Sequence, residues 1–238
     1  MIKVITSKDN PRVKFACSLK ENKYRKMNKM FLAETFKSLE MALLHHQVVE
    51  VFTTKWLDIP EDIPQNLVSE EVLKKISSNV SPEGVVFIAK MNEYKDEQYH
   101  KILYLDGVSD PGNVGTLIRT ALAFNYDAVF VSEDSCSIYN EKVINSTKGA
   151  IFAIPVFEKD IQKIIDGHQT IVSTLDNDSV DLNDVSVPNK FILVLGNESH
   201  GVRKEVAKLA NIKVKISINN IDSLNVAVAG GILMNRIR

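Results

Sequence analysis

The chain is poor in cysteine: its 238 residues include two, Cys17 and Cys136. They lie far apart and show no C-x-x-C spacing, which disfavours a disulfide framework or a zinc site and predicts two buried thiols. Long apolar runs are also missing. The first residues lack the apolar stretch of a secretory signal, and no run reaches the roughly 18 residues that a membrane span needs. We therefore expect a cytoplasmic protein that does not cross a membrane.

Two nucleotide-binding fingerprints are absent as well. The sequence contains neither G-x-G-x-x-G nor G-x-x-x-x-G-K-[ST], so dinucleotide dehydrogenases and P-loop NTPases lose their main support. The histidines show no metal-ligand pattern, because His45 and His46 are adjacent without partners at ligand spacing and His200 stands alone. We expect no metal site.

Charge of either sign is nearly balanced overall, at a net −1, but it is unevenly distributed. Residues 1–37 contain ten Lys and Arg against three acids, whereas residues 38–100 contain five against eleven. A basic run is more often a solvated helix face than a nucleic-acid contact, so this pattern alone leaves both interpretations open. The candidate RNA-contacting residues in it are Arg12, Lys14, Lys23, Arg25 and Lys26.

Residues 1–90 alternate helical and strand patterns. Apolar periodicity, β-rich runs and a capping Ser69 predict helices at 13–29, 35–46 and 70–78, with strands at 31–34, 48–54 and 84–90. This alternation predicts a small layered α/β domain. The polar, aperiodic residues 91–101 then predict an interdomain linker.

Residues 102–238 repeat the alternation on a larger scale. Near-continuous apolar strands are predicted at 102–105, 128–132, 170–174, 191–195 and 212–218, and helices at 113–124, 140–148, 160–167, 203–209 and 224–236. Strands of this kind indicate a mostly parallel sheet covered on both faces. Ligands of such sheets bind beyond the carboxyl ends of the strands.

The first segment with chemical interest is DGVSDPGNVGTLIR, Asp106 to Arg119. Pro111 and Gly112 suit a turn, and Asn113 is a candidate cap for the helix that follows. Arg119 lies off the apolar stripe of this helix, about 130° from its centre at 100° per residue. Helical side chains lean toward the N-terminus, so we expect Arg119 to point back over Gly115 toward the loop, with nothing at Gly115 to block it.

Two further segments follow in the same half of the chain. LGNESHGV, from Leu195, comes directly after a predicted buried strand and carries Glu198. DSLNVAVAG, from Asp222, opens the last predicted helix, with Ser223 as its candidate N-cap. Small residues on this helix, including Gly230, predict close packing against its neighbours.

These three segments, in this order, resemble the three motifs of the SpoU (TrmH-like) branch of the SPOUT RNA methyltransferases. The resemblance implies transfer of a methyl group from S-adenosylmethionine to a ribose 2′-oxygen of RNA. It also implies a homodimer through the C-terminal domain and a deep C-terminal trefoil knot, which pattern reasoning would never predict. Residues 1–90 resemble the L30e-like RNA-binding extension of the 23S-rRNA-modifying subgroup, which favours rRNA over tRNA as the substrate.

The resemblance also assigns roles to individual residues. It implies that Arg119 acts on the ribose hydroxyl, with support from Asn113. An arginine stays protonated, so we favour Arg119 as a stabiliser of the developing alkoxide and a phosphate contact over a role as base, with Glu198 as another candidate proton acceptor. Ser223 and Asn225 complete the implied catalytic set. The implied cofactor contacts are Thr174, Leu175, Gly196, Asn197, Ile216, Ile218, Leu224 and Asn225.

The chain departs from the family pattern at two places. The segment from Ile216 to Ser223 is one residue short and lacks the usual proline and glycine, and we expect Asn219 or Asn220 to take the left-handed conformation instead. Thr35 stands where the family pattern has glycine. Two alternatives therefore stay open: a tRNA 2′-O-methyltransferase, or a catalytically idle RNA-binding protein of the same fold.

Overall fold

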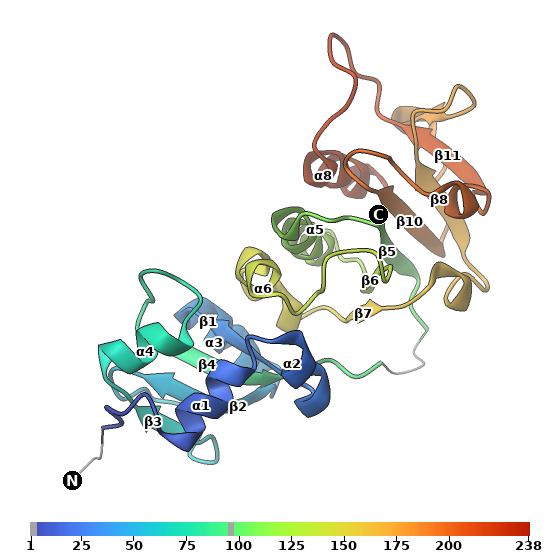
Figure 1. The fold of residues 1–238 in the computed structure, drawn as a ribbon. Helices are drawn as coiled ribbons and strands as arrows, with labels where there is room; N and C mark the ends of the chain where they lie inside the picture. The colour runs from blue at the N-terminus through green and yellow to red at the C-terminus, as the bar shows by residue number, and fades with distance from the viewer. Residues whose placement is uncertain (1–3, 95–97) are drawn as a thin grey trace. The chain divides into compact units, whose positions relative to one another are not determined.

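The computed structural model describes residues 4–94 and 98–238 (Figure 1). The chain divides into two compact units, Met1–Glu93 and Tyr94–Arg238. The division falls inside the predicted linker, and Tyr94 packs its ring edge-on against Phe157 of the second unit, with centroids 5.2 Å apart. Residues 95–97 of that linker lie outside the described residues.

The N-terminal unit is a four-stranded sheet with helices packed on it. The strands run in the order β1 (Met30–Glu34), β4 (Val85–Lys90), β2 (Val48–Thr53) and β3 (Gln65–Leu67). β4 is antiparallel to β1 and β2, whereas β3 is parallel to β2. The helices are α1 (Pro11–Ser18), α2 (Asn22–Asn28), α3 (Phe36–Leu44) and α4 (Glu70–Ile76), and Ser69 caps α4 as predicted.

The single helix predicted over residues 13–29 is wrong, because the chain forms α1 and α2 with a break at residues 19–21. In a continuous helix the carbonyls of Leu19 and Lys20 would accept from backbone N–H groups four residues on. Here both accept from Nη1 of Arg25 instead, at 3.1 and 2.6 Å. The arginine therefore takes the backbone acceptors that helix continuation requires.

The C-terminal unit is built on a seven-stranded sheet in which every pair of neighbouring strands is parallel. The strands, in spatial order, are β7 (Val156–Glu158), β6 (Ala128–Val131), β5 (Lys101–Asp106), β10 (Phe191–Gly196), β8 (Gln169–Ser173), β11 (Ile212–Lys215) and β9 (Val180–Asp181). The central strands are buried along nearly their whole length, which confirms the predicted parallel α/β sheet.

Helices cover both faces of this sheet. On one face lie α5 (Pro111–Ala123), α6 (Glu141–Thr147) and α8 (Val226–Arg236), with α5 packed between α6 and α8 (Figure 1). On the other face, Tyr104, Phe130 and Ile192 pack against Ile161 of a short 3-10 turn and Val206 of α7 (Lys204–Ala207). The predicted helix over 160–167 is wrong, since the helical part there is one 3-10 turn at residues 161–163.

Glycine permits two close approaches among the helices. A Cβ on Gly115 of α5 would lie 2.5 Å from Cβ of Ser146 and 2.6 Å from the carbonyl oxygen of Val143, both on α6. A Cβ on Gly230 of α8 would lie 2.3 Å from Leu117 and 2.8 Å from Leu195. The expected close packing of the last helix is thus present at Gly230. The trefoil knot stays a prediction.

Candidate active site

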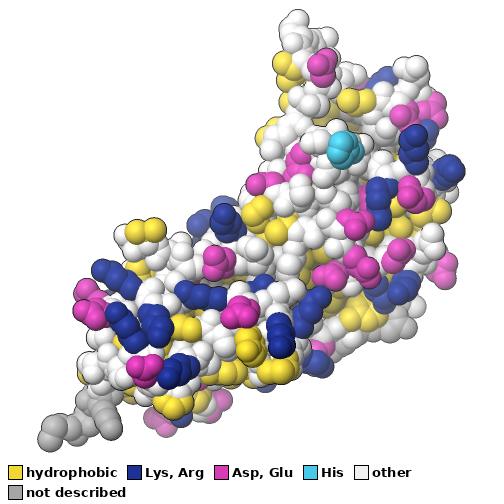
Figure 2. Space-filling view, viewed as in Figure 1, with side chains coloured by type: hydrophobic (Ala, Val, Ile, Leu, Met, Phe, Trp, Pro, Cys, Tyr) yellow, Lys and Arg dark blue, Asp and Glu magenta, His cyan; other side chains and the backbone are white. Residues whose placement is uncertain are grey.

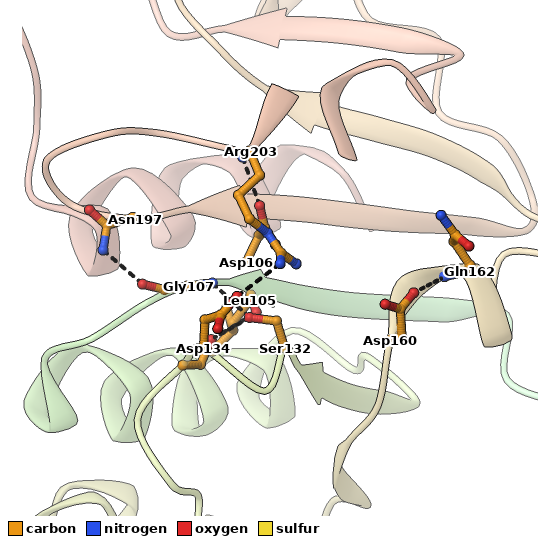
Figure 3. Close-up of polar contacts among 10 residues, drawn as sticks. Leu105, Asp106, Gly107, Ser132, Asp134, Asp160, Gln162, Asn197 and Arg203 are labelled. Atoms are coloured by element: carbon orange, nitrogen blue, oxygen red, sulfur yellow. Dashed lines mark hydrogen bonds and ion pairs between the residues drawn. The ribbon is translucent and has the colours of Figure 1, made fainter. Parts of the chain in front are cut away.

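The candidate site lies where the first two motif segments leave the sheet. β5 and β10 are adjacent and parallel, and Asp106 pairs with Gly196 at their carboxyl ends (Figure 1). The loop after β5 therefore lies beside the loop after β10. A hydrogen bond joins them, because Nδ2 of Asn197 donates to the carbonyl oxygen of Gly107 at 2.8 Å (Figure 3).

Beneath these loops lies a fully buried carboxylate, that of Asp106. Arg203 encloses it: the backbone N–H of Arg203 donates to Oδ2 at 2.8 Å, while Nε at 2.8 Å and Nη2 at 2.6 Å approach Oδ1 (Figure 3). Nη1 of the same arginine contacts the exposed Asp134 at 2.9 Å. Hydrogen bonding to Asp106 raises the pKa of Arg203 and outweighs the opposing effect of burial.

Glu198 links the second motif to the first. Its carboxylate accepts from Nδ2 of Asn113 at 2.9 Å, from the backbone N–H groups of Asp110 at 3.2 Å and Ser109 at 3.3 Å, and from the Ser109 hydroxyl at 3.2 Å. Burial raises the pKa of Glu198, but these hydrogen bonds outweigh it and hold the pKa below its ordinary value. Glu198 is therefore an ionised acceptor held by donors of the first motif.

Asn113 carries the connection on to the third motif. Its Oδ1 accepts from Nδ2 of Asn225 at 3.1 Å, so Glu198, Asn113 and Asn225 form one hydrogen-bonded chain across all three segments. Neither predicted cap is right. Asp110 caps α5, which places Asn113 inside the helix, and Asn225 caps α8 in place of Ser223.

A pocket of about 640 Å³ opens beside the hydrogen-bonded side chains of Glu198, Asn113 and Asn225. It is lined by seven of the eight residues with predicted cofactor contacts, and by Glu198 and Ser223 of the catalytic set. Asn113, Asn225 and Arg119 do not line it. The seven predicted cofactor contacts that line the pocket are Thr174, Leu175, Gly196, Asn197, Ile216, Ile218 and Leu224.

The pocket suits S-adenosylmethionine in size and chemistry. Its volume falls in the range of small-molecule sites, roughly 300–1,000 Å³. Apolar walls from Ile216, Ile218 and Leu224 suit a purine ring, while Asp176 and Asn197 offer polar partners for hydroxyl and amino groups. A Cβ on Gly196 would lie 2.2 Å from the backbone of Gly201 and Val202, so glycine is required for the loop to fold back here.

The shortened loop between β11 and α8 adopts the conformation that the sequence suggested. Asn220 has a φ of 67°, in the left-handed region, whereas Asn219 is not among the positive-φ residues. The hydroxyl of Ser217, between the pocket residues Ile216 and Ile218, donates to the carboxylate of Asp181. This hydrogen bond ties the loop to the edge strand β9.

Arg119 is exposed on α5, and within residues 4–94 and 98–238 no hydrogen bond or ion pair holds its guanidinium. Our expectation about Gly115 needs correction. Gly115 is buried against Ser146 and Val143 of α6, so its missing side chain serves helix packing and does not leave a path for Arg119.

The predicted RNA-contacting residues divide into two groups. Arg12, Lys14, Lys23 and Lys26 are exposed on α1 and α2, where several Lys and Arg side chains gather (Figure 2). Arg12 pairs with Glu50 at 2.5 Å and Lys14 with Asp9 at 3.0 Å. Arg25 is buried and holds the break between the helices, so it does not join this surface.

Comparison with known proteins identifies the family. Residues 100–235 match the SpoU rRNA methylase family. The chain belongs to that family. Residues 10–86 match the MRM3-like substrate binding domain. Both matches agree with the resemblance seen in the sequence.

Known relatives align with this SpoU family member over nearly its whole length. It is 29% identical to the 23S rRNA (guanosine(2553)-2′-O)-methyltransferase of Bacillus subtilis, with 100% of each chain covered. It is 28% identical to an uncharacterised tRNA/rRNA methyltransferase of Synechocystis, covering 98% of this chain and 93% of the relative. The structure of an rRNA methyltransferase from Sinorhizobium meliloti with bound S-adenosylmethionine superposes with a TM-score of 0.89 at 28% identity, covering 99% of this chain and 97% of that one. The predicted enzyme class, an S-adenosylmethionine-dependent RNA methyltransferase, is confirmed.

Two residues of this SpoU site were missed in the sequence. Asp106 begins the first motif segment and Arg203 follows the second, yet they are 97 positions apart. Their residue types gave no signal that they pair.

Among the described residues, no group of three or more His, Cys, Asp or Glu side chains is placed to hold a metal ion. In the same part of the chain, no helix has the length and apolarity to cross a membrane.

Proposed function

We propose that this protein transfers the methyl group of S-adenosylmethionine to a ribose 2′-hydroxyl of rRNA, with 23S rRNA as the preferred substrate. The observation that carries the proposal is the hydrogen-bonded chain from Glu198 through Asn113 to Asn225, which brings all three motifs together beside the pocket. The relative from Bacillus subtilis, whose name gives this reaction and this RNA, aligns over the whole chain and supports the choice of substrate.

The pocket residues would hold the cofactor, which supplies a methyl group on a positively charged sulfur. Leu175, Ile216 and Leu224 would pack against its apolar parts, and the backbone of residues 196–202 would wrap around it. Closing apolar walls over the cofactor excludes water, which strengthens electrostatic interactions at the reacting atoms.

Arg119 is the residue that we assign to the ribose. A ribose hydroxyl becomes a good nucleophile only when its proton is removed or its oxyanion is stabilised. Arg119 keeps its charge, lies on the helix that also carries Asn113, and is free of partners among the described residues, so its guanidinium is available to the developing alkoxide or an adjacent phosphate.

Glu198 has a different part in the proposal. A carboxylate whose pKa lies below its ordinary value is a weak base at neutral pH. It accepts hydrogen bonds from two backbone N–H groups, the Ser109 hydroxyl and Asn113. We therefore assign Glu198 to holding Asn113 and the first motif loop in place, and not to proton removal.

The N-terminal unit would bind RNA through the exposed face of α1 and α2. Lys23 and Lys26 are exposed there and form no ion pair with any described residue. Phosphate binding by such side chains is salt-dependent, because each contact releases counterions. Charge reversal at Lys23 and Lys26 should weaken RNA binding and flatten its dependence on salt.

A second copy of the chain would cover α8. The inner side of α8 packs on α5 and β10 at Gly230, and Leu233 is buried. Val228 and Ile232, one turn apart, are 53% and 40% exposed. An apolar pair at this spacing suits helix packing between subunits. Analytical ultracentrifugation of Ile232→Asp against wild type tests the dimer.

Methyl transfer from labelled S-adenosylmethionine to total cellular RNA tests the function. Label recovered from rRNA as an alkali-resistant 2′-O-methyl dinucleotide is the expected result. Label recovered in tRNA and not in rRNA would show that tRNA is the substrate, contrary to the proposal. A folded protein that binds RNA but neither transfers label nor binds the cofactor in isothermal titration would be an idle RNA-binding protein.

A further inference from the structure

Asp106 is a buried charge that the proposed chemistry does not use. Its side chain is fully inaccessible, and a buried carboxylate is tolerated only when it is paired and hydrogen-bonded. The described contacts to its oxygens come from one residue, Arg203, through the backbone N–H at 2.8 Å, Nε at 2.8 Å and Nη2 at 2.6 Å (Figure 3). The arginine is fixed by both its main chain and its side chain.

This contact closes the loop that lines the pocket. All residues from Gly196 to Val202 line it, and Arg203 comes next. The loop is pinned internally, since Asn197 and Gly201 exchange backbone hydrogen bonds of 2.9 and 3.0 Å. Its first end is fixed by Asn197 on Gly107, and its last end by Arg203 on Asp106. Both anchors thus lie on two consecutive residues at the end of β5.

We propose that Asp106 and Arg203 are positioning residues that hold the loop 196–202 in the form that binds S-adenosylmethionine. They act through the loop and touch neither the cofactor nor the RNA. The inference rests on the proposed function for its ligand. It predicts that the pair controls the affinity for the cofactor, with a smaller effect on turnover once the cofactor is bound.

The arginine offers a graded set of variants. Arg203→Ala leaves Asp106 with the backbone N–H alone, whereas Arg203→Lys keeps the positive charge but loses the two-pronged contact of Nε and Nη2. Asp134→Asn is the matched control, because it alters the other carboxylate on the same arginine, at 2.9 Å, but one that is 67% exposed. Exposed ion pairs contribute little.

The test measures the Kd for S-adenosylmethionine by isothermal titration, and its KM and kcat in methyl transfer, on the full chain. We expect Kd and KM to rise about 10- to 100-fold in Arg203→Ala and less in Arg203→Lys, because small misplacements of binding groups have effects of this size. The kcat at saturating cofactor should fall by no more than about fivefold, and Asp134→Asn should stay within about twofold of wild type. Where Arg203→Ala does not fold, Arg203→Lys carries the test.

Hydrogen exchange of the 196–203 peptide in the cofactor-free protein gives a second readout, and Arg203→Lys should exchange faster there than Asp134→Asn. Wild-type cofactor affinity in a folded Arg203→Lys, or a loss confined to kcat, would overturn the positioning role and leave the proposed function standing. A wild-type chain that binds no S-adenosylmethionine would overturn the proposed function, and this role with it.

Discussion

Replacing Gly115 by alanine tests how the α5–α6 contact places the site. The added Cβ would lie 2.5 Å from Cβ of Ser146 and 2.6 Å from the carbonyl oxygen of Val143, where ordinary contacts begin near 3.4 Å. The carbonyl is backbone, so rotating a side chain cannot relieve the overlap, and α6 must move away by about 1 Å. Overpacking costs about 1–3 kcal/mol, and a clash with backbone places this case in the upper part of that range, at about 2–3 kcal/mol. The helix propensity of alanine returns up to about 1 kcal/mol.

We therefore expect a net loss of about 1–2 kcal/mol, or about 3–8 °C in the melting temperature of a unit of this size. Methyl transfer should fall too, because α5 carries both Asn113 and Arg119. The exposed neighbour Thr116→Ala is the control and should lower neither quantity, because its alanine meets no overlap and has the higher helix propensity. Thermal unfolding followed by circular dichroism measures the first, and labelled methyl transfer the second. An unchanged or raised melting temperature in Gly115→Ala would refute the reasoning.

Three more variants test separate contacts. The pKa of Glu198 is lower in the folded protein than its ordinary value of 4.5. The ionised carboxylate therefore stabilises the fold fully at pH values above 4.5, and this contribution is lost as the pH falls through the lowered pKa. The melting temperature of wild type should exceed that of Glu198→Gln at pH 7, and the gap should shrink at pH 3.5; a constant gap would contradict the assignment. Tyr126→Phe removes a buried 2.6 Å hydrogen bond to the carbonyl of Ile237 and should cost about 1–2 kcal/mol in urea unfolding with kcat unchanged, so equal unfolding midpoints would count against it. Thr35 has a φ of 86°, so Thr35→Gly should be more stable than Thr35→Ala by about 1–2 kcal/mol in the same assay, and the reverse order would show that no strain is stored there.

The sequence predicted the elements with long apolar patterns. Buried strands such as Phe191–Gly196 and the capped helix after Ser69 have local signals strong enough to place them. The strands at Val156–Glu158 and Val180–Asp181 were missed because three and two residues are too few to show a period. The break before α2 was missed because it depends on where the Arg25 side chain lies, which periodicity does not report.

The candidate site divides in the same way. Residues within the motif segments, such as Asn197 and Leu224, line the pocket, and their contact with the cofactor stays a prediction. Both predicted N-caps were wrong because each loop has two side chains, within three positions, that are able to cap the helix. In the structure Asp110 caps α5 in place of Asn113, and Asn225 caps α8 in place of Ser223. Asp106 and Arg203 could not be paired without the sheet, since only the parallel pairing of β5 and β10 brings them together.

The most direct test of the central claim is the rate of ribose 2′-O-methyl transfer by Arg119→Ala compared with wild type, at saturating S-adenosylmethionine and with rRNA as acceptor. Removing a single donor to a developing oxyanion lowers turnover by about 10²–10³-fold. We predict a loss of that size, with cofactor affinity unchanged because Arg119 does not line the pocket. An Arg119→Ala protein that transfers label to the same 2′-oxygen at the wild-type rate would contradict the account.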